Sequence, residues 1–193
     1  MTTALLPNTA PAPILPRRRQ LLFGSAFASV AWAMFLLTLV GMYLQARQGD
    51  AAWLGENVLR LTQPNVQFGT LILSLFTVQW AVYSIARNDR GHAYLALAIT
   101  LLFGVAFINQ TTFLYDEAGI KLASAEGPLF YAVTGGHLAM LIVALIFLAL
   151  MSVRALGGNF SERYPDGLSA AALFWYVNVG LYAVIWLAVY IMK

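Results

Sequence analysis

The chain has 193 residues, of which 61% are hydrophobic and only 10% charged, and its mean hydropathy is +0.74. A water-soluble domain carries charge on about a quarter of its residues, so this composition indicates that lipid covers most of the chain. The net charge of +3 gives no indication of nucleic-acid binding. Cysteine is absent and only two histidines occur, which excludes disulfides and iron–sulfur clusters and leaves too few ligands for a haem or copper centre within this chain.

The amino-terminal segment differs in composition from the rest of the chain. Residues 1–16 are rich in Pro, Thr and Ala, and three arginines follow at 17–19 before a long apolar run begins. We expect residues 1–20 to form a disordered tail and residues 21–193 to form one transmembrane domain. The apolar run is longer than a signal-peptide core and lacks a clear cleavage site, so a retained first helix is expected.

Hydropathy predicts an all-α fold, an integral membrane bundle of five transmembrane helices. A helix needs about 20 apolar residues to cross the hydrocarbon core. Five segments meet this requirement, and every charged residue falls outside them: residues 21–46, 66–86, 93–115, 128–153 and 170–192. Pro64 and Asn65 are expected to mark the start of the second helix, and Gly157 and Gly158 the end of the fourth.

The basic residues predict the orientation of the bundle. One side of the membrane receives the tail, the turn near residue 90 and the loop 154–169, and the other side receives the remaining loops and the carboxyl terminus. The first side carries seven basic residues, which are Arg17, Arg18, Arg19, Arg87, Arg90, Arg154 and Arg163. Because basic loops stay inside, we expect the amino terminus in the cytoplasm and the carboxyl terminus outside.

No Asp, Glu, Lys or Arg lies in the middle of a predicted helix, although pumps and ion-coupled transporters usually place such residues there. This absence favours a scaffold over a proton relay. Uncharged polar side chains do occur within the helices, and we expect Gln79, Asn109, Gln110 and Asn178 to form interhelical polar contacts. For His137, an interhelical hydrogen bond and a site for a polar ligand or lipid headgroup are equally open.

Arg154 closes the fourth predicted helix on the inner side. Its simplest role is that of an orientation anchor whose guanidinium reaches the phosphates of the bilayer. The alternative is specific binding of one phospholipid headgroup.

Short segments in a consistent order and spacing carry a resemblance to a known family. They are MYLQAR at 42–47, PN at 64–65, FTVQWAV at 76–82, NQ at 109–110, LFY at 129–131 with TGGH at 134–137, and ALFWY at 172–176. From about residue 30 to the end, the chain resembles subunit III of the haem–copper oxidases (cytochrome c oxidase type), in particular the short five-helix bacterial form.

The resemblance implies a non-catalytic accessory subunit of a terminal oxidase in a prokaryotic cell membrane. Such a subunit binds catalytic subunit I and further oxidase subunits, holds phospholipid and supports proton uptake in a complex that reduces oxygen to water and pumps protons. The haem and copper would lie in partner subunits, with no metal or cofactor in this chain. His137 and Arg154 match a family histidine and a family lipid-headgroup arginine, so lipid binding is the role implied for both.

The chain also departs from the family pattern at positions that carry charge or histidine in other members. These positions hold Trp32 or a neighbour, a residue near Phe113, Met140 and Tyr176, and Asn178 lies beside the place of a missing family aspartate. A function of the missing carboxylates therefore cannot be carried over to this chain.

Other functions stay open on the sequence. The chain is also compatible with an accessory subunit of a nitric oxide reductase or of a quinol oxidase. A small independent transporter would need a polar pathway through the bundle, and transport of a neutral solute does not require buried charge. An intramembrane enzyme is disfavoured, because no Ser/His/Asp set or metal-ligand cluster is available at depth.

Overall fold

The computed structural model describes residues 19–49, 53, 60–158 and 166–192, and within these ranges the chain is helical with no strand. The elements are α1 (Gln20–Gly49), α2 (Thr62–Ala86), α3 (Arg90–Ala118), α4 (Gly127–Leu156), α5 (Asp166–Ile185) and the π-helical turn η1 (Trp186–Ile191). All five long helices are apolar enough to cross a membrane. The predicted all-α bundle of five transmembrane helices is confirmed, while most of the predicted tail lies outside the described residues.

The helices are longer than the apolar segments that predicted them. α1 and α4 each have 30 residues, which corresponds to about 45 Å of helix against about 30 Å of hydrocarbon. The additional turns carry charged side chains such as Arg90 and Arg154 into the headgroup layer. α2 begins at Thr62, so Pro64 lies inside its first turn and the predicted start at residue 66 was late. Pro is tolerated there because the first helical N–H groups have no partner within the helix.

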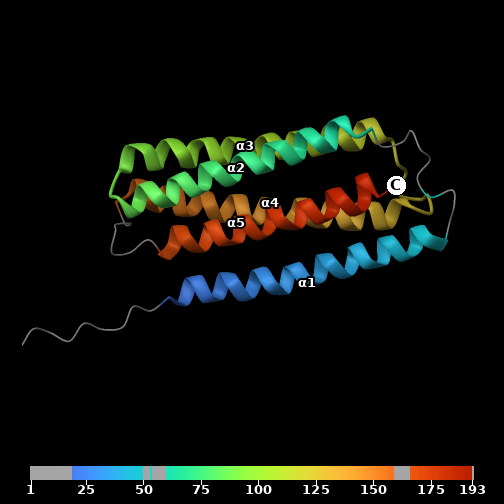
Figure 1. The fold of residues 1–193 in the computed structure, drawn as a ribbon, viewed down its shortest axis with the longest axis horizontal. Coiled ribbons are helices and arrows are strands. Elements are labelled where there is room, and N and C mark those ends of the chain that lie inside the picture. The colour runs from blue at the N-terminus through green and yellow to red at the C-terminus, as the bar shows by residue number, and fades with distance from the viewer. Residues whose placement is uncertain (1–18, 50–52, 54–59, 159–165, 193) are drawn as a thin grey trace, which may run out of the picture.

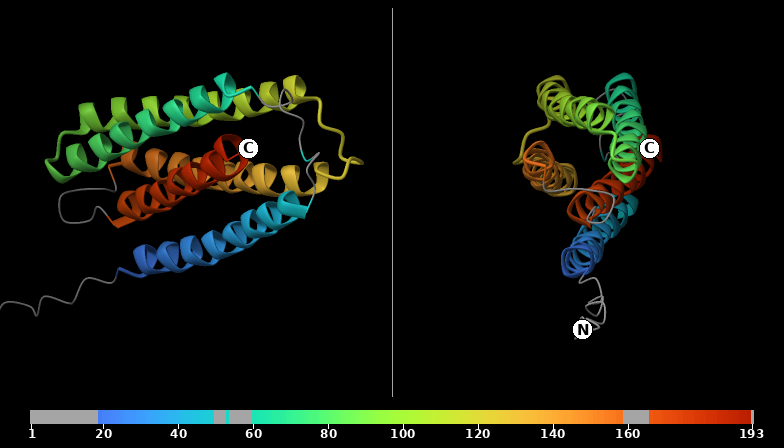
Figure 2. Two further views of the ribbon diagram at one scale, coloured as in Figure 1. Left: turned by 45° about the vertical axis from the view of Figure 1, so that its right-hand side comes forward. Right: turned by 90° about the vertical axis from the view of Figure 1, so that its left-hand side faces the viewer.

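The five helices form an elongated bundle in which α5 occupies the centre (Figure 1). α2 and α3 pack on each other as a pair, and α5 contacts α1, α2 and α4. The end-on view shows α1 on the far side of α5 from the α2–α3 pair (Figure 2). In the most apolar stretch of α5 and η1, 56% of the residues are buried inside the bundle. In the most apolar stretch of α1, only 22% are buried. α1 is therefore the peripheral helix, with most of its surface available to lipid or to another protein.

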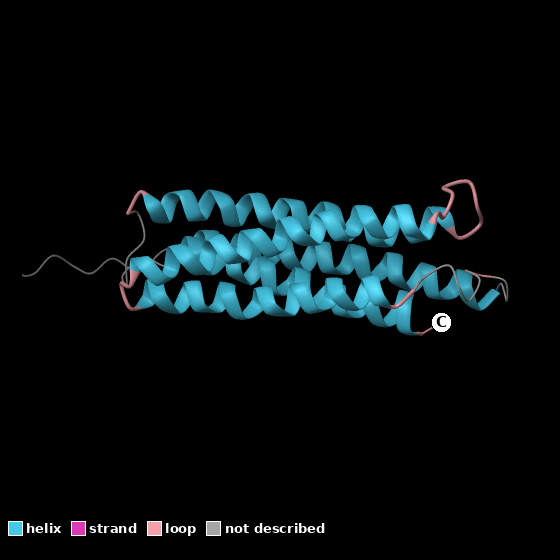
Figure 3. Ribbon diagram, turned by 90° about the horizontal axis from the view of Figure 1, so that it is seen from above, coloured by secondary structure: helices cyan, strands magenta, loops and turns pink. Residues whose placement is uncertain are grey.

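Seen from above, the helices run nearly along one axis (Figure 3). One apolar cluster fills most of the interior, and a second lies toward the end where α1 finishes. Large apolar side chains point outward as well, for example Phe27, which is 74% exposed, and Phe76, which is 69% exposed. In a bilayer these side chains contact acyl chains, so their exposure carries no penalty of transfer into water.

The start of α4 lies so close to the preceding loop that only glycine fits there. A Cβ atom at Gly127 would lie against the carbonyl oxygen of Lys121 and 3.0 Å from the Cα of Leu122. We expect Gly127→Ala to lower the free energy of unfolding by about 1–3 kcal/mol, because the loop backbone must move. At Gly135 the nearest atom is the Tyr115 hydroxyl at 3.8 Å, so Gly135→Ala is the control in thermal unfolding. Equal stability of the two variants would contradict this packing.

Asp89 caps α3 in the short turn after α2. Its Oδ1 accepts a hydrogen bond from the backbone N–H of His92 at 3.2 Å, and its Oδ2 lies 2.7 Å from Nδ1 of the same residue. The backbone N–H first, and then the side chain of His92, hold the pKa of Asp89 below its usual value. A lowered carboxylate pKa stabilises the fold above the pKa of the unfolded chain, and this contribution is lost as the pH falls through the folded value.

We therefore expect Asp89→Ala to lower the melting temperature at neutral pH. Its difference from the unmodified chain should shrink as the pH falls below the usual pKa of an aspartate, because the cap then weakens in the unmodified chain too. Thermal melts across an acidic pH series measure this. Asp116→Ala, at an exposed position near the other end of α3, is the control. A difference that stays constant with pH would rule out the charged cap.

Candidate functional site

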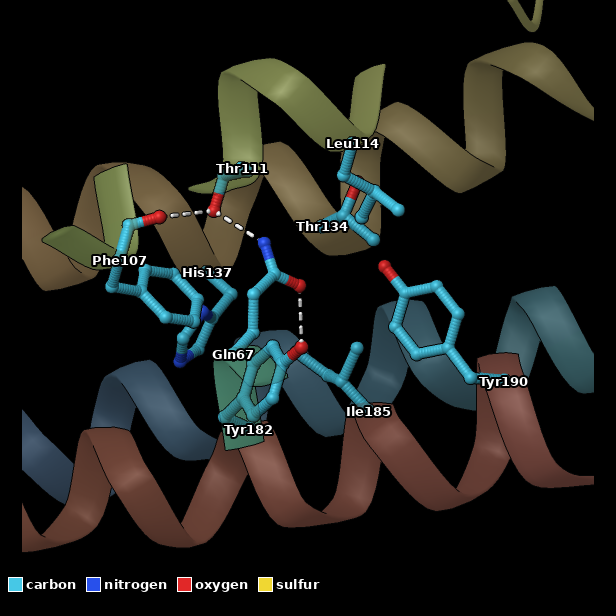
Figure 4. A pocket seen from close by; sticks show the side chains of 9 residues that line it. All are labelled: Gln67, Phe107, Thr111, Leu114, Thr134, His137, Tyr182, Ile185 and Tyr190. Atoms are coloured by element: carbon cyan, nitrogen blue, oxygen red, sulfur yellow. Dashed lines mark hydrogen bonds between the residues drawn. The ribbon is translucent and has the colours of Figure 1, made fainter. Parts of the chain in front are cut away.

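A buried hydrogen-bond network joins α2, α3 and α5 in the part of the bundle toward the end of α5 (Figure 4). The Tyr182 hydroxyl donates to Oε1 of Gln67 at 2.7 Å, and Nε2 of Gln67 donates to Oγ1 of Thr111 at 3.0 Å. The Thr111 hydroxyl donates to the Phe107 carbonyl at 2.8 Å. Because none of these side chains is more than 4% exposed, the network is shielded from lipid and fixes the register of three helices.

His137 lies beside this network and is 1% exposed. Its Nε2 is 3.0 Å from the Asn178 carbonyl oxygen, so α4 donates a hydrogen bond to α5 at this point. The imidazole packs against Tyr182 and Phe107, with ring centroids 5.3 and 5.7 Å away. His137 is thus an interior, interhelical residue in this chain.

Asn178 is fully buried on α5. Its Nδ2 donates to the Phe174 carbonyl one turn earlier at 3.0 Å, so the side-chain bond is within the helix and only the backbone carbonyl reaches α4. Its Oδ1 is buried and has no hydrogen-bond partner among the described residues.

The other predicted polar residues lie at different places around the bundle. Gln79 accepts a hydrogen bond from the Tyr176 hydroxyl and so links α2 to α5. Nε2 of Gln110 donates to Oγ1 of Thr70 at 3.1 Å and links α3 to α2. Asn109 is exposed on α3, and its interhelical contact stays a prediction.

Two further interhelical bonds lie closer to the other end of the bundle. Nε1 of Trp175 on α5 donates to Oγ of Ser74 on α2 at 2.9 Å. The hydroxyls of Thr77 and Thr100 join α2 to α3 at 2.8 Å. Hydroxyl, indole and amide groups thus form hydrogen bonds between the helices along most of the length of the bundle, as expected for helices packed in lipid.

Arg154 is exposed in the last turn of α4, far from the network. Since 17 residues of one helix separate it from His137, the two side chains are about 25 Å apart along the axis. They cannot form one binding site. Arg90, at the start of α3, reaches the turn that follows α4, since its Nη1 lies 3.7 Å from where a Cβ of Gly158 would be.

The described interior contains no acidic or strongly basic side chain, since its buried polar residues are only Ser, Thr, Gln, Asn and His. The described residues also contain no group of three or more His, Cys, Asp or Glu side chains placed to hold a metal ion. At the surface, the side chains of Arg60 and Glu117 form an ion pair at 3.9 Å.

Sequence reasoning missed Gln67, Thr111 and Tyr182, which form the central network. Gln67 follows the predicted start of its helix by one residue, and Tyr182 sits in a run of apolar residues. The sequence contained only a weak indication of these contacts. A polar side chain near a predicted helix end is explained equally well by a position in the headgroup layer, where it contacts water and lipid headgroups.

These features define a multi-pass helical membrane protein with hydrogen-bonded polar contacts between its helices. A family model described as Cytochrome c oxidase subunit III matches residues 22–193. The chain therefore belongs to the cytochrome c oxidase subunit III family.

Individual relatives agree with this assignment. Cytochrome c oxidase subunit 3 of Drosophila yakuba is 29% identical over 169 residues, which cover 86% of this chain and 62% of the relative. That of Spodoptera frugiperda is 33% identical over 122 residues, or 63% of this chain and 80% of the relative. Cytochrome c oxidase subunit 3 of Cyprinus carpio is 32% identical over 129 residues, which cover 66% of this chain and 48% of the relative. The chain spans less than two thirds of the length of the Drosophila and carp proteins.

Proposed function

We propose that this chain is the non-catalytic accessory subunit III of a membrane-bound haem–copper terminal oxidase. In this role it binds catalytic subunit I, stabilises it during oxygen reduction and proton pumping, and holds phospholipid. The haem and copper belong to partner subunits, and the electron donor belongs to the complex. The membrane is a prokaryotic cell membrane, with the amino terminus of the chain in the cytoplasm and its carboxyl terminus outside.

The observation that carries this proposal is the family match over residues 22–193, together with the character of the interior. The buried side chains are engaged mainly in packing and in hydrogen bonds between helices, and no buried acid or strong base lies among the described residues. A bundle of this kind supplies rigid surface to a partner, and it lacks the ionisable groups that carry protons through a membrane protein. The peripheral position of α1 leaves a broad apolar face for lipid and for neighbouring subunits.

The test is to purify the oxidase with and without this chain and to follow each preparation through many turnovers. We expect the complex that lacks the chain to start at a similar rate but to inactivate earlier and to carry less phospholipid. An equal catalytic lifetime together with equal lipid content would contradict the proposal.

The lipid part of the proposal rests on Arg154. Its side chain is exposed at the end of α4, and Arg90 reaches toward Gly158 in the turn that follows this helix. Two guanidinium groups at the level of the headgroups suit a lipid phosphate. For His137 lipid binding stays a prediction, and its burial favours a role inside the bundle.

We expect Arg154→Gln to reduce the anionic phospholipid that co-purifies with the complex. One basic residue near a membrane surface contributes about 1 kcal/mol, which corresponds to roughly fivefold weaker binding. Quantitative lipid mass spectrometry after detergent washing measures this loss. Arg47→Gln, in the last turn of α1 at the opposite end of the bundle, is the matched control. Identical lipid retention in both variants would argue that Arg154 is an orientation anchor alone.

A further inference from the structure

One face of α3 is turned away from the other helices of the bundle. It presents exposed residues at alternating intervals of three and four positions, which are Leu95, Ala98, Leu102, Val105, Asn109 and Thr112. This heptad spacing places the six side chains in one line along the helix, and we call them the α3 stripe. α3 packs its other sides on α2 and α4 and lies on the far side of α5 from α1 (Figure 2). The α3 stripe is therefore open to the surroundings of the bundle.

Asn109 is the amide of this stripe, and it lies at the depth of the hydrocarbon. α3 has 29 residues and is about 44 Å long, so a centred helix extends about 7 Å beyond each side of a hydrocarbon core of about 30 Å. Asn109 precedes Ala118, the last residue of α3, by about 14 Å. Its carboxamide is therefore about 7 Å inside the outer boundary of the hydrocarbon, which is farther than this short side chain reaches.

The carboxamide of Asn109 has no partner within the described part of the chain. The backbone carbonyl of Asn109 accepts a hydrogen bond from the Thr112 hydroxyl at 2.8 Å, but no described residue bonds to its side chain. Two other exposed polar side chains inside helices are paired within the chain. Thr38 donates to the backbone carbonyl one turn earlier at 2.8 Å, and Gln79 accepts from a hydroxyl on α5. Asn109 thus differs from both in needing a group from outside the chain.

The exposed stripe of α4 has a different character. Its residues are all apolar, namely Val143, Ile146, Leu150 and Val153, so it suits acyl chains. Acyl chains offer no hydrogen-bonding group, and an unpaired amide in hydrocarbon is costly. In membrane proteins such amides bond to polar groups of a neighbouring helix. An apolar stripe with one amide in the hydrocarbon therefore indicates a surface on which another helix packs.

We propose that the α3 stripe is an interaction surface for a transmembrane helix of a neighbouring subunit. The partner helix packs apolar side chains against the leucines and the valine of the stripe, and one of its amide or hydroxyl side chains bonds to Asn109. Ala98 and Thr112 are small and allow the two backbones to approach closely. A single Asn in a heptad seam specifies the register of two helices, so Asn109 sets the depth at which the partner binds.

The charge beyond the stripe favours a different polypeptide over a second copy of this chain. Asp116 continues the same line two turns farther out and is exposed. Two copies insert in the same orientation, so their α3 helices would run parallel and bring the two Asp116 carboxylates opposite each other. Like charges in this position repel, whereas a basic residue is attracted. The partner is therefore a helix with an amide or hydroxyl at the depth of Asn109 and a Lys or Arg farther out, facing Asp116.

Photocrosslinking in the intact membrane complex tests this contact. Val105→benzoylphenylalanine places a photoreactive group in the α3 stripe, and Val143→benzoylphenylalanine places the same group on α4. The two positions are matched, because Val105 is 55% exposed and Val143 is 54% exposed. We expect illumination to link position 105 to a transmembrane segment of another subunit with the polar and basic residues described above. Position 143 should be linked to lipid.

Removal of the amide is expected to weaken the same contact. Asn109→Leu should reduce the amount of the crosslinked subunit that stays with the tagged chain in detergent, by roughly threefold and at most roughly twentyfold. Thr38→Val is the matched control, because the Thr38 hydroxyl is already paired within α1, and it should leave the amount unchanged. Quantitative mass spectrometry of the purified complex measures both variants.

Several results would overturn the proposal. They are lipid adducts alone at position 105, a crosslink to a second copy of this chain, a linked helix without a polar side chain at the depth of Asn109, and unchanged retention in Asn109→Leu. The inference rests on the proposed function in that the partner is sought in the oxidase complex, but the two fail separately. Lipid adducts alone at position 105, in a complex that retains its catalytic subunit, would contradict this inference and leave the proposed function intact.

Discussion

Replacing Trp175 with alanine is expected to destabilise the bundle more than any other single truncation considered for this protein. Trp175 is fully buried on α5, and its indole N–H donates to Ser74 on α2. Its ring also comes within 3.0 Å of where a Cβ of Gly104 on α3 would be, so α3 and α5 meet closely at this point. The variant would leave a large cavity at the junction of three helices and would remove the hydrogen bond that the Ser74 hydroxyl accepts, although this hydroxyl still donates to the Leu71 carbonyl. Truncation of a buried aromatic residue costs about 3–5 kcal/mol of unfolding free energy.

Unfolding in mixed micelles measures this loss, and a second tryptophan provides the matched control. Trp80 lies on the lipid-facing side of α2 and is 36% exposed, so Trp80→Ala should cost much less. Trp175→Phe keeps most of the volume and loses the hydrogen bond, which is expected to give an intermediate value. Equal losses for Trp175→Ala and Trp80→Ala would contradict the central position of Trp175.

Breaking the contact between Tyr182 and Gln67 is expected to give the second largest effect. Tyr182→Phe removes the donor to Oε1 of Gln67 and leaves a buried amide oxygen without its partner. An unsatisfied buried polar group costs about 1–3 kcal/mol. The effect should be measurable as a lower unfolding free energy with no change in helix content by circular dichroism.

A double-mutant cycle separates the hydrogen bond from the packing of the two side chains. When Gln67→Leu is added to Tyr182→Phe, no unpaired amide remains, so the double variant should lose less than the sum of the single losses. Hydrogen bonds between membrane helices show coupling of about 0.6 kcal/mol on average and about 1.7 kcal/mol at most. Strict additivity of the two substitutions would show that the contact contributes nothing to stability.

The architecture of the chain was predictable because hydrocarbon imposes a simple requirement on sequence. A membrane helix must be apolar for about 20 residues, and the five segments that satisfy this correspond to α1 to α5. The boundaries were less predictable, because a helix continues into the headgroup layer where charge is tolerated. Arg90, Asp116, Glu117 and Arg154 all lie in helical turns beyond the predicted segments.

The interior arrangement was predictable only in part. Hydropathy assigns Gln67 and Tyr182 to helices but does not tell which face of each helix looks inward, since all faces are apolar in a membrane bundle. The contact between them spans 115 positions of sequence, so no local pattern reveals it. The π-helical register of η1 was equally hidden, because it depends on which backbone groups pair at the end of α5 and not on hydropathy.

We propose that the chain serves an oxidase as a helical accessory subunit that has no redox centre of its own. Affinity purification through a tag on this chain, in mild detergent and with haem spectra and copper analysis, tests it most directly. We predict that haem and copper co-purify with a larger catalytic subunit and stay with that subunit when stronger detergent releases the tagged chain. Recovery of the chain free of any oxidase subunit in mild detergent, or of metal that follows the released chain, would contradict the account.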